Sequence, residues 1–147
     1  MDLGLQGRVA LITGGSKGIG LAIAQRLAAE GCALHLVSRT QADLDAARAE
    51  IAARHGVAVT VHALDMSGRG SAEALGAKCG DLDILVNNAG ATPRGALDEV
   101  DEGRWRKAFD LKVFGYINLS RVFYTRMKAR RRGVIINIIG NGGERVD

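Results

Sequence analysis

The sequence predicts a single α/β domain, residues 1–147, whose core is a doubly wound parallel sheet. The first observation is an alternation, in which short aliphatic and β-branched runs are separated by longer stretches with helical spacing of apolar residues. The second is the presence of 20 glycines but one proline, because strand-to-helix turns need glycine and helix interiors exclude proline. Apolar residues make up 47% of the chain, which is enough for a core and excludes a disordered protein.

The first strand and the first helix have the clearest signals. The run 9–12 is short and apolar and is followed at once by glycines, which indicates a buried strand. Apolar residues then recur with helical spacing over 18–30, and Gly31 closes that stretch. The chain therefore opens with a strand, a tight turn and a helix.

The same alternation continues along the chain. In order, the expected elements are a strand at 33–37, an Ala-rich amphipathic helix at 41–54, a strand at 57–61, a weaker helix at 67–78, a strand at 82–86, a long helix at 101–129 and a strand at 134–139. Each strand is a short aliphatic run, and each helix shows a longer period. Strands that alternate with helices favour parallel βαβ units with right-handed crossovers.

The fifth expected strand comes close to the end of the sequence. In a doubly wound sheet this strand would be an open edge, unless more chain follows it or another chain pairs with it. We therefore expect a sheet that is truncated after the fifth strand. A fragment, an incompletely described chain and an obligate assembly all remain open as explanations.

Cysteine usage and hydropathy limit the setting of the protein. Cys32 and Cys79 form no CxxC pair, no signal-peptide pattern is found, and no apolar run is long enough to span a membrane. We therefore expect a cytoplasmic protein with free thiols and no membrane partner. A metal site is not expected, because His35, His55 and His62 do not cluster with the cysteines at ligand spacing.

The net charge of +4 is unevenly distributed. Residues 101–132 hold ten Lys or Arg residues against three acidic ones, and basic patches attract phosphate-bearing partners. Aromatic residues do not interleave with the arginines at the end of the long helix, so nucleic acid is not an expected partner. We interpret this cluster as a solvated helix C-terminus whose charges complement the helix dipole.

The segment 13–20 is a glycine-rich turn between the first strand and the first helix. Gly14 suits a tight turn, while Gly18 and Gly20 remove Cβ atoms where a pyrophosphate and the neighbouring strand must come close. The helix then directs its free N–H groups at the phosphates. The candidate cofactor-binding residues here are Thr13, Gly14, Ser16, Lys17, Gly18, Ile19 and Gly20. An ordinary glycine-rich turn is the alternative.

This Thr-Gly-x-x-x-Gly-x-Gly pattern, together with the block Asn87-Asn88-Ala89-Gly90 after the fourth strand, resembles the paired signatures of the classical short-chain dehydrogenase/reductase family. The resemblance covers the whole chain and implies a Rossmann-type dinucleotide-binding fold. It also implies that Asn87, Asn88, Ala89 and Gly90 support the central sheet and line the cofactor. Short side chains at these positions leave room for a dinucleotide across the strand ends. A plain Asn-rich turn is the alternative.

The end of the second strand indicates which nucleotide is preferred. An acidic residue there would bind the ribose 2′-OH and favour NAD, but this chain has Ser38, Arg39 and Thr40. Arg39 can form two hydrogen bonds with a 2′-phosphate, and Lys17 could add a second positive charge. Both features resemble NADP-preferring members of the family, so NADP(H) is the expected cofactor and NAD(H) a possible one. Solvated surface charges are the alternative.

Asp65 and Met66 directly follow the third strand. By resemblance, this position contacts the adenine of the cofactor. A helix N-cap or a loop carboxylate is an equally good interpretation of Asp65.

The resemblance implies hydride transfer between nicotinamide and a carbonyl or alcohol. A Tyr acts as acid and base, a Lys lowers its pKa, a Ser orients the substrate, and an Asn in the long helix supports a proton relay. The Tyr-x-x-x-Lys motif should follow the fifth strand, and the sequence ends before it. Tyr124 and Lys128 have this spacing but precede the fifth strand, so we interpret the match as a coincidence.

Two further positions depart from the family pattern, and they give the candidate catalytic residues Lys112 and Asn141. Lys112 occupies the usual Asn position. On an α-helical wheel it shares a face with Trp105, Ala108, Phe109, Tyr116, Leu119 and Phe123. Lys112 therefore either faces the site, where it could meet a phosphate, a carboxylate or a relay water, or snorkels at an interface. Gly140 occupies the usual Ser position, which leaves Asn141 as the nearest polar substitute.

The leading hypothesis is an NADP(H)-dependent oxidoreductase that acts on a small-molecule carbonyl or alcohol. The alternative is a catalytically silent nucleotide-binding or assembly module on the same fold, which Lys112, Gly140 and the missing Tyr-x-x-x-Lys segment favour. By family resemblance, a homo-oligomer formed through the long helix is also expected.

Overall fold

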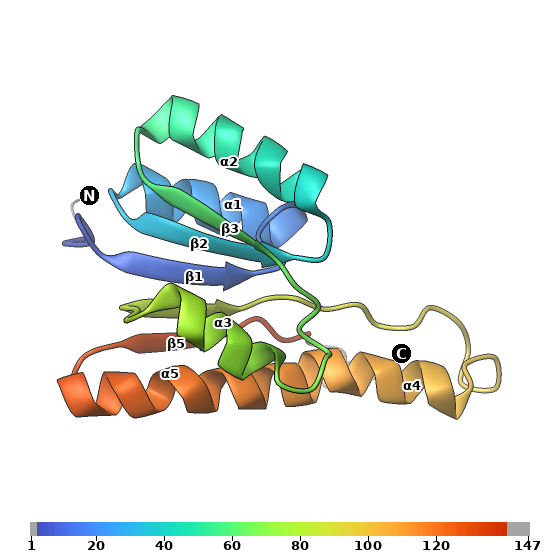
Figure 1. Ribbon diagram of the computed structural model, residues 1–147. Coiled ribbons are helices and arrows are strands. Elements are labelled where there is room, and N and C mark those ends of the chain that lie inside the picture. Colours follow the sequence, from blue (N-terminus) through green and yellow to red (C-terminus); the bar gives the residue numbers. More distant parts are fainter. Residues whose placement is uncertain (1–2, 141–147) are drawn as a thin grey trace.

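The computed structural model describes residues 3–140 of the 147-residue chain. The elements in order are β1 (Val9–Thr13), α1 (Gly18–Ala29), β2 (Ala33–Ser38), α2 (Gln41–His55), β3 (Val59–Ala63), α3 (Ser71–Cys79), β4 (Ile84–Asn87), α4 (Glu102–Phe109), the π-helix η1 (Asp110–Gly115), α5 (Tyr116–Arg130) and β5 (Val134–Asn137) (Figure 1). The predicted alternation of strands and helices is confirmed. None of the helices within 3–140 is long and apolar enough to cross a membrane.

The five strands form one parallel sheet in the order β3-β2-β1-β4-β5. The chain moves outward from β1 to β3 and then returns to the other side of β1 with β4. The strand order therefore reverses between β1 and β4, and the loops that leave these two strands diverge. In open α/β sheets, ligands bind at the carboxyl ends of the strands at such a switch point.

Helices cover both faces of the sheet, which confirms the doubly wound arrangement (Figure 1). On one face, α1 and α2 pack against alternate residues of β1 and β2, with Leu34 and Leu36 fully buried. On the other face, α3 and α5 pack against the intervening residues, and Phe123 and Leu85 lie at the centre of that core. The central strands β1 and β4 are buried on both sides, which is why they read as continuous aliphatic runs in the sequence.

Four elements differ from the sequence prediction by two or more residues at an end. Strand β4 begins at Ile84 and not at 82. Strand β3 runs over Val59–Ala63 and not 57–61, because it pairs in register with β2 as far as Ser38. Strand β5 ends at Asn137 and not at 139. Helix α3 begins at Ser71 and not at 67, because Asp65 accepts hydrogen bonds from the backbone N–H and the hydroxyl of Ser67 and holds that segment in a turn.

The long helix expected over 101–129 contains a π-helical segment, η1, between α4 and α5. A π turn takes more residues than an α turn, so a single α-helical wheel does not describe both ends. The prediction that Phe109 and Phe123 share one apolar face is wrong for this reason. Phe123 is fully buried, whereas Phe109 is 51% exposed.

The arginines at the end of α5 are part of the fold, which corrects their interpretation as a solvated cluster. Arg126 donates hydrogen bonds to the carbonyls of Gly76 and Gly80 at the end of α3. Arg130 donates to the carbonyl of Leu82 and to Asp83, and Arg132 also pairs with Asp83. These cations tie α5 to α3 and to the start of β4.

Asp83 is the centre of this network, since its carboxylate also accepts the backbone N–H of Val9 at 3.0 Å. Burial raises the pKa of this carboxyl, but the Val9 N–H and the charges of Arg132 and Arg130 outweigh it and hold the pKa below its usual value. The ionised carboxylate thus links β1, β4 and the end of α5.

We predict that Asp83→Asn lowers the free energy of unfolding at pH 7 by about 1.5–3 kcal/mol, the range for hydrogen bonds to charged groups. The folded-state pKa is depressed, so this stabilisation is complete above the unfolded pKa of about 3.9 and is lost as the pH falls through the folded value. Urea unfolding of both proteins should therefore show a difference that shrinks below about pH 4. Asp81→Asn is the matched control, because Asp81 is exposed and lies 3.8 Å from Arg130. An equal loss in both variants would contradict the role of Asp83.

Candidate functional site

A cavity of about 490 Å³ lies at the carboxyl ends of β1, β2, β3 and β4. Its volume is within the range of small-molecule and cofactor sites. Twelve of the predicted site residues line it: Gly14, Ser16, Lys17, Ile19, Ser38, Arg39, Asp65, Met66, Asn88, Ala89, Gly90 and Lys112. Residues from 14 to 138 thus meet at the switch point of the sheet, as the topology requires.

The glycine-rich turn has the backbone that its sequence predicts. Gly14 has φ +65° and donates its N–H to the Val37 carbonyl at 2.7 Å. A Cβ on Gly20 would collide with the Gly14 carbonyl oxygen, whereas one on Gly18 would meet open space. Helix α1 begins at Gly18 without a side-chain cap on its first N–H groups. Free N–H groups at a helix N-terminus form a binding site for an anion.

Thr13 and Asn88 fasten this turn to the loop after β4. The Thr13 hydroxyl oxygen accepts the backbone N–H groups of Asn88 and Ala89, both at 2.9 Å. In return, the Asn88 amide donates to the carbonyls of Thr13 and Gly14. Thr13 is 2% exposed and does not line the cavity. Thr13 therefore connects the glycine-rich turn to the loop that contains Asn88 and Ala89. The hydrogen bonds of Thr13 and Asn88 are called the clamp below.

Four other predicted residues also lie outside the cavity lining, namely Gly18, Gly20, Thr40 and Asn87. Thr40 is exposed at the start of α2. Asn87 is buried, and its amide donates to Ser120 and Asn137. Asn87 thus supports the sheet without facing the cavity. Asn141, one of the two candidate catalytic residues, lies outside the described residues.

Polar and charged groups gather at the end of β2. The hydroxyl oxygen of Ser38 is buried and has no hydrogen-bond partner among residues 3–140. Arg39 is exposed and also lines a second cavity of about 290 Å³. Lys17 lies nearby, but its ammonium group pairs with Asp43 at 2.9 Å. Part of the Lys17 charge is therefore already neutralised, which the sequence did not indicate.

Asp65 is a loop carboxylate that also borders the cavity, and its contact with an adenine stays a prediction. The carboxylate closes the turn with Ser67. The hydrogen bond from the Ser67 hydroxyl, followed by that from the Ser67 N–H, holds the pKa of Asp65 below its ordinary value. The charges of Arg39 and Lys107 act in the same direction. Asp65 is therefore a fixed anion at neutral pH.

Lys112 extends from η1 into the cavity. A Cβ added to Gly90 would lie 2.9 Å from the Lys112 ammonium nitrogen, so the lysine chain passes directly over the Gly90 backbone. Its stem also lines a small apolar cavity beside Trp105 and Phe109. Of the two orientations that the sequence left open, the structure has the one in which the ammonium group lies at the cavity.

Sequence reasoning missed residues that position the β5 side of the cavity. Tyr116 donates its hydroxyl hydrogen bond to the Ile138 carbonyl, and burial raises the pKa of that phenol. Ile138 in turn donates its N–H to the Asn87 carbonyl and lines the cavity. One signal was present, because Asn87 and Asn137 each end a strand, and the two strands are neighbours in register.

Tyr124 and Lys128, which have Tyr-x-x-x-Lys spacing, line a separate cavity near the end of α5. Tyr124 is 57% exposed. Neither residue lines the cavity at the sheet edge.

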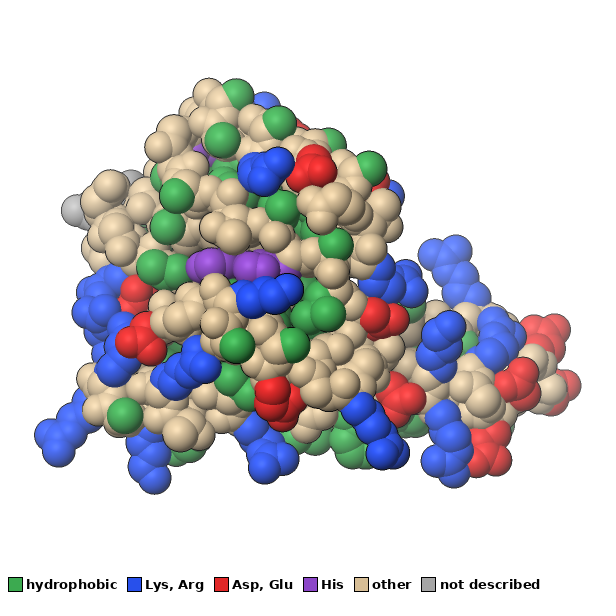
Figure 2. All heavy atoms as spheres, in the orientation of Figure 1, with side chains coloured by type: hydrophobic (Ala, Val, Ile, Leu, Met, Phe, Trp, Pro, Cys, Tyr) green, Lys and Arg blue, Asp and Glu red, His purple; other side chains and the backbone are tan. Residues whose placement is uncertain are grey.

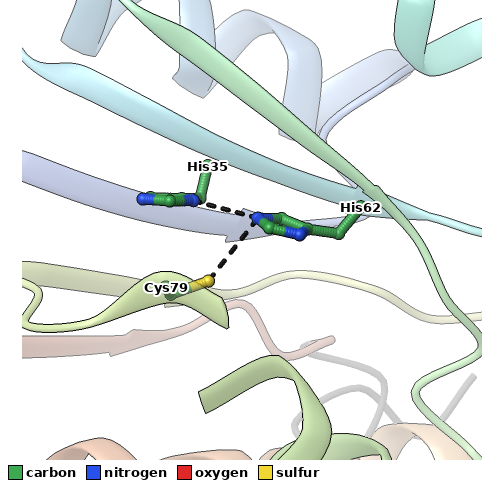
Figure 3. Close-up of side chains that lie close together, drawn as sticks. All are labelled: His35, His62 and Cys79. Atoms are coloured by element: carbon green, nitrogen blue, oxygen red, sulfur yellow. Dashed lines mark hydrogen bonds between the residues drawn. The ribbon is translucent and has the colours of Figure 1, made fainter. Parts of the chain in front are cut away.

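The expectation that the histidines do not cluster with a cysteine is wrong for three residues. His35 on β2, His62 on β3 and Cys79 at the end of α3 lie together, with ligand atoms within 4.8 Å of one another (Figure 3). Linear spacing could not show this, because the cluster depends on the pairing of two strands separated by a helix. None of the three lines the cavity of about 490 Å³.

Comparison with known proteins gives one consistent result. The model of the short chain dehydrogenase family matches residues 8–146. An uncharacterized oxidoreductase of Methylorubrum extorquens is 42% identical over 139 residues, which cover 91% of this chain and 55% of that protein. The D-beta-hydroxybutyrate dehydrogenase of Cupriavidus necator is 36% identical, with 95% and 55% covered. The chain thus spans about half the length of these curated relatives.

Solved structures agree with the sequence matches. The L-sorbose reductase of Gluconobacter frateurii, complexed with NADPH and L-sorbose, has a TM-score of 0.88 at 37% identity, covering 93% of this chain and 54% of that one. A metagenomic short-chain oxidoreductase in complex with NADP has a TM-score of 0.89 at 35% identity, covering 97% and 66%.

We predict that Thr13→Val, which keeps the shape but removes the acceptor oxygen, destabilises the fold by about 1–3 kcal/mol. The reason is that two buried N–H groups lose their partner. Thr13→Ser keeps the oxygen and serves as the matched control, with a smaller loss. Chemical denaturation of the three proteins measures both effects. Equal stability of wild type and Thr13→Val would refute the clamp.

Proposed function

The chain belongs to the short chain dehydrogenase family, and from that premise we propose that it binds NADP(H) in the cavity at the sheet edge and serves an oxidoreductase that interconverts a carbonyl and an alcohol. The observation that carries the cofactor preference is the end of β2. There, a buried Ser38 hydroxyl without a partner among the described residues adjoins the exposed guanidinium of Arg39. A 2′-phosphate supplies acceptor oxygens to both groups.

The residues present fit a dinucleotide from end to end. The uncapped N-terminus of α1 accommodates the diphosphate, since its free N–H groups and positive dipole end favour an anion. Open space at Gly18 leaves room for the phosphates. Asp65 and Met66 line the part of the cavity that would hold the adenine. The groups at the opposite end are Gly90, Lys112 and Ile138.

When bound, the nicotinamide would supply the hydride. The protein would bind and orient the cofactor and the substrate, and would exclude water from them. Lys112 is a charged residue of the cavity lining and occupies the position where the family usually has Asn. An ammonium group there could hold a relay water or a negatively charged substrate oxygen. The substrate is a small molecule, and no observation identifies it further.

A catalytically silent nucleotide-binding module remains the second candidate. Lys112 at the usual Asn position and Gly140 at the usual Ser position both favour it. This candidate shares the cofactor site with the first one and differs in turnover only.

We also propose that a second copy of the chain packs on α4, η1 and α5. These helices carry exposed apolar side chains, namely Phe109, Phe114, Ile117 and Tyr124. An interface between two copies would cover these four exposed apolar side chains.

We predict that Arg39→Asp shifts the preference from NADPH toward NADH. Loss of a charge-assisted contact worth about 1.5–3 kcal/mol weakens NADPH binding about 10- to 100-fold. The introduced carboxylate can accept the 2′-OH of NADH. Titrations read by nicotinamide fluorescence measure both affinities. Arg54→Asp is the matched control, because Arg54 lies on the last turn of α2 and does not line the cavity. An unchanged NADPH/NADH ratio in Arg39→Asp would count against the 2′-phosphate contact.

Turnover distinguishes the two candidate functions. We expect carbonyl-dependent NADPH oxidation by the purified protein or by a longer product of the same gene, measured over a panel of aldehydes, ketones and sugars. Lys112→Met, which keeps the side-chain length without the charge, should reduce the rate at least tenfold if Lys112 assists proton transfer, since such groups contribute about 10²–10⁴-fold. NADPH affinity should change little. Binding without oxidation in every sample would favour the silent module.

A further inference from the structure

The His35–His62–Cys79 cluster lies on the sheet face that α3 and α5 cover, beside α3 (Figure 3). His35 and Val37 alternate with the buried Leu34 and Leu36 of β2, so His35 points to the α3 side. His62 projects from β3 toward the same space, and Cys79 reaches it from the last residue of α3. Figure 2 shows histidine side chains at the molecular surface, between the upper part of the view, which holds α1 and α2, and α3 below it.

The contacts within the cluster are short. His35 Nδ1 and His62 Nε2 are 2.9 Å apart, and Cys79 Sγ lies 3.6 Å from His62 Nε2. The two imidazole rings are stacked, with an interplanar angle of 16°. A single ring nitrogen of His62 thus faces both other ligand atoms.

We propose that His35, His62 and Cys79 bind one Zn²⁺ ion, with a water molecule in the fourth position. Two imidazoles and a thiolate are a ligand set that zinc prefers. Three protein ligands with one open position also occur in zinc sites of other proteins. The proposed function does not use this ion, so the two proposals stand independently.

The spacing of the ligand atoms fits this ion. Zn–N bonds of about 2.05 Å and Zn–S bonds of about 2.3 Å place tetrahedral ligands about 3.3 Å (N to N) and about 3.6 Å (N to S) apart. The observed separations along two edges are 2.9 Å and 3.6 Å. The widest pair lies within 4.8 Å, so closing the third edge to the tetrahedral N-to-S separation requires a movement of at most about 1.2 Å.

The electrostatic setting leaves both imidazoles free to bind, while the charges of Arg126 and Lys78 and the protonated thiol oppose the ion. Burial lowers the pKa of His35 and of His62, and Lys78 and the neighbouring ring lower that of His62 further. Both imidazoles are therefore neutral at pH 7 and can offer lone pairs. Burial raises the pKa of Cys79 to about 11 against the opposing charges of Arg126 and Lys78. Zinc must displace the thiol proton, so its affinity should rise with pH.

The ion would link the last residue of α3 directly to β2 and β3. Helix α3 has nine residues and begins after Gly70, which has a left-handed conformation. A zinc bridge from Cys79 to β2 and β3 would fix the end of this short helix to the edge half of the sheet. Zinc should therefore raise the melting temperature of the protein.

The test uses tag-free protein, freed of metals with a chelator and reduced. Titration with Zn²⁺ against a chromophoric competitor chelator gives the affinity and the stoichiometry, and we expect one ion per chain. Titration with Co²⁺ should produce the near-ultraviolet charge-transfer band of a cobalt–thiolate bond. Circular dichroism of each variant before titration verifies that it is folded.

Matched variants assign the ligands. Cys79→Ser should abolish the cobalt–thiolate band and weaken Zn²⁺ binding at least 100-fold, because even the loss of a residue that only orients a ligand costs about 10- to 100-fold. His62→Gln should weaken Zn²⁺ binding equally. The controls are Cys32→Ser and His55→Gln, which lie outside the cluster and should bind as the wild type does.

Each outcome decides the proposal. One tight Zn²⁺ ion that is lost in His62→Gln and retained in both controls supports it, and Cys79→Ser adds the identity of the sulfur ligand if that variant folds. Folded wild-type protein that binds no Zn²⁺, or binding that His62→Gln leaves unchanged, overturns it. In that case the cluster is a hydrogen-bonded packing arrangement only.

Discussion

The structure depends on the clamp between Thr13 and the loop after β4. At the switch point, the chain must leave β1 toward one face and β4 toward the other, and the two loops must nevertheless stay in a fixed relation. One hydroxyl oxygen accepts two N–H groups from the β4 loop, while the Asn88 amide returns two hydrogen bonds to the β1 turn. Gly14 and Gly20 are required in the same place because their neighbours leave no room for a Cβ. These contacts fix the relative position of the two loops that border the cavity.

The basic end of α5 shows how a surface pattern can be part of the internal structure. Arg126 and Arg130 donate hydrogen bonds to carbonyl groups at the end of α3 and before β4. A neighbouring parallel strand does not satisfy these carbonyl groups. A buried carbonyl without a partner is costly. The arginines thus complete the hydrogen bonding of two chain ends, and their charge is balanced partly by Asp83. Asp83 and Asp81 balance only part of this positive charge, since Lys128, Arg131 and Arg132 are exposed.

The sequence was sufficient for the doubly wound parallel fold and for most of the cavity lining. The buried central strands β1 and β4 give aliphatic runs, and Gly14 and Gly20 of the turn lie where a Cβ would collide with its neighbours. It was insufficient where two segments had to meet in space. The Lys17–Asp43 pair and the His35–His62 contact both depend on how β1, β2 and β3 pair and how α2 follows. The spacing of residues along the sequence does not reveal such contacts. The π-helical segment was equally invisible, because its residues differ little from those of an α-helix.

That segment has a consequence for tolerance to insertion and deletion. Each residue of an α-helix turns the chain by about 100°, so the additional residue in η1 sets the rotation of α4 relative to α5. Tyr116 and Phe123 are fixed against the sheet, whereas α4 has no buried residue to resist rotation. Loss of one residue among Val113, Phe114 and Gly115 would turn α4 and Lys112 by about 100° relative to α5 and move the Lys112 ammonium group away from Gly90. Because Leu111 packs against the core between α3 and α5, such a deletion would remodel one wall of the cavity at a cost in stability.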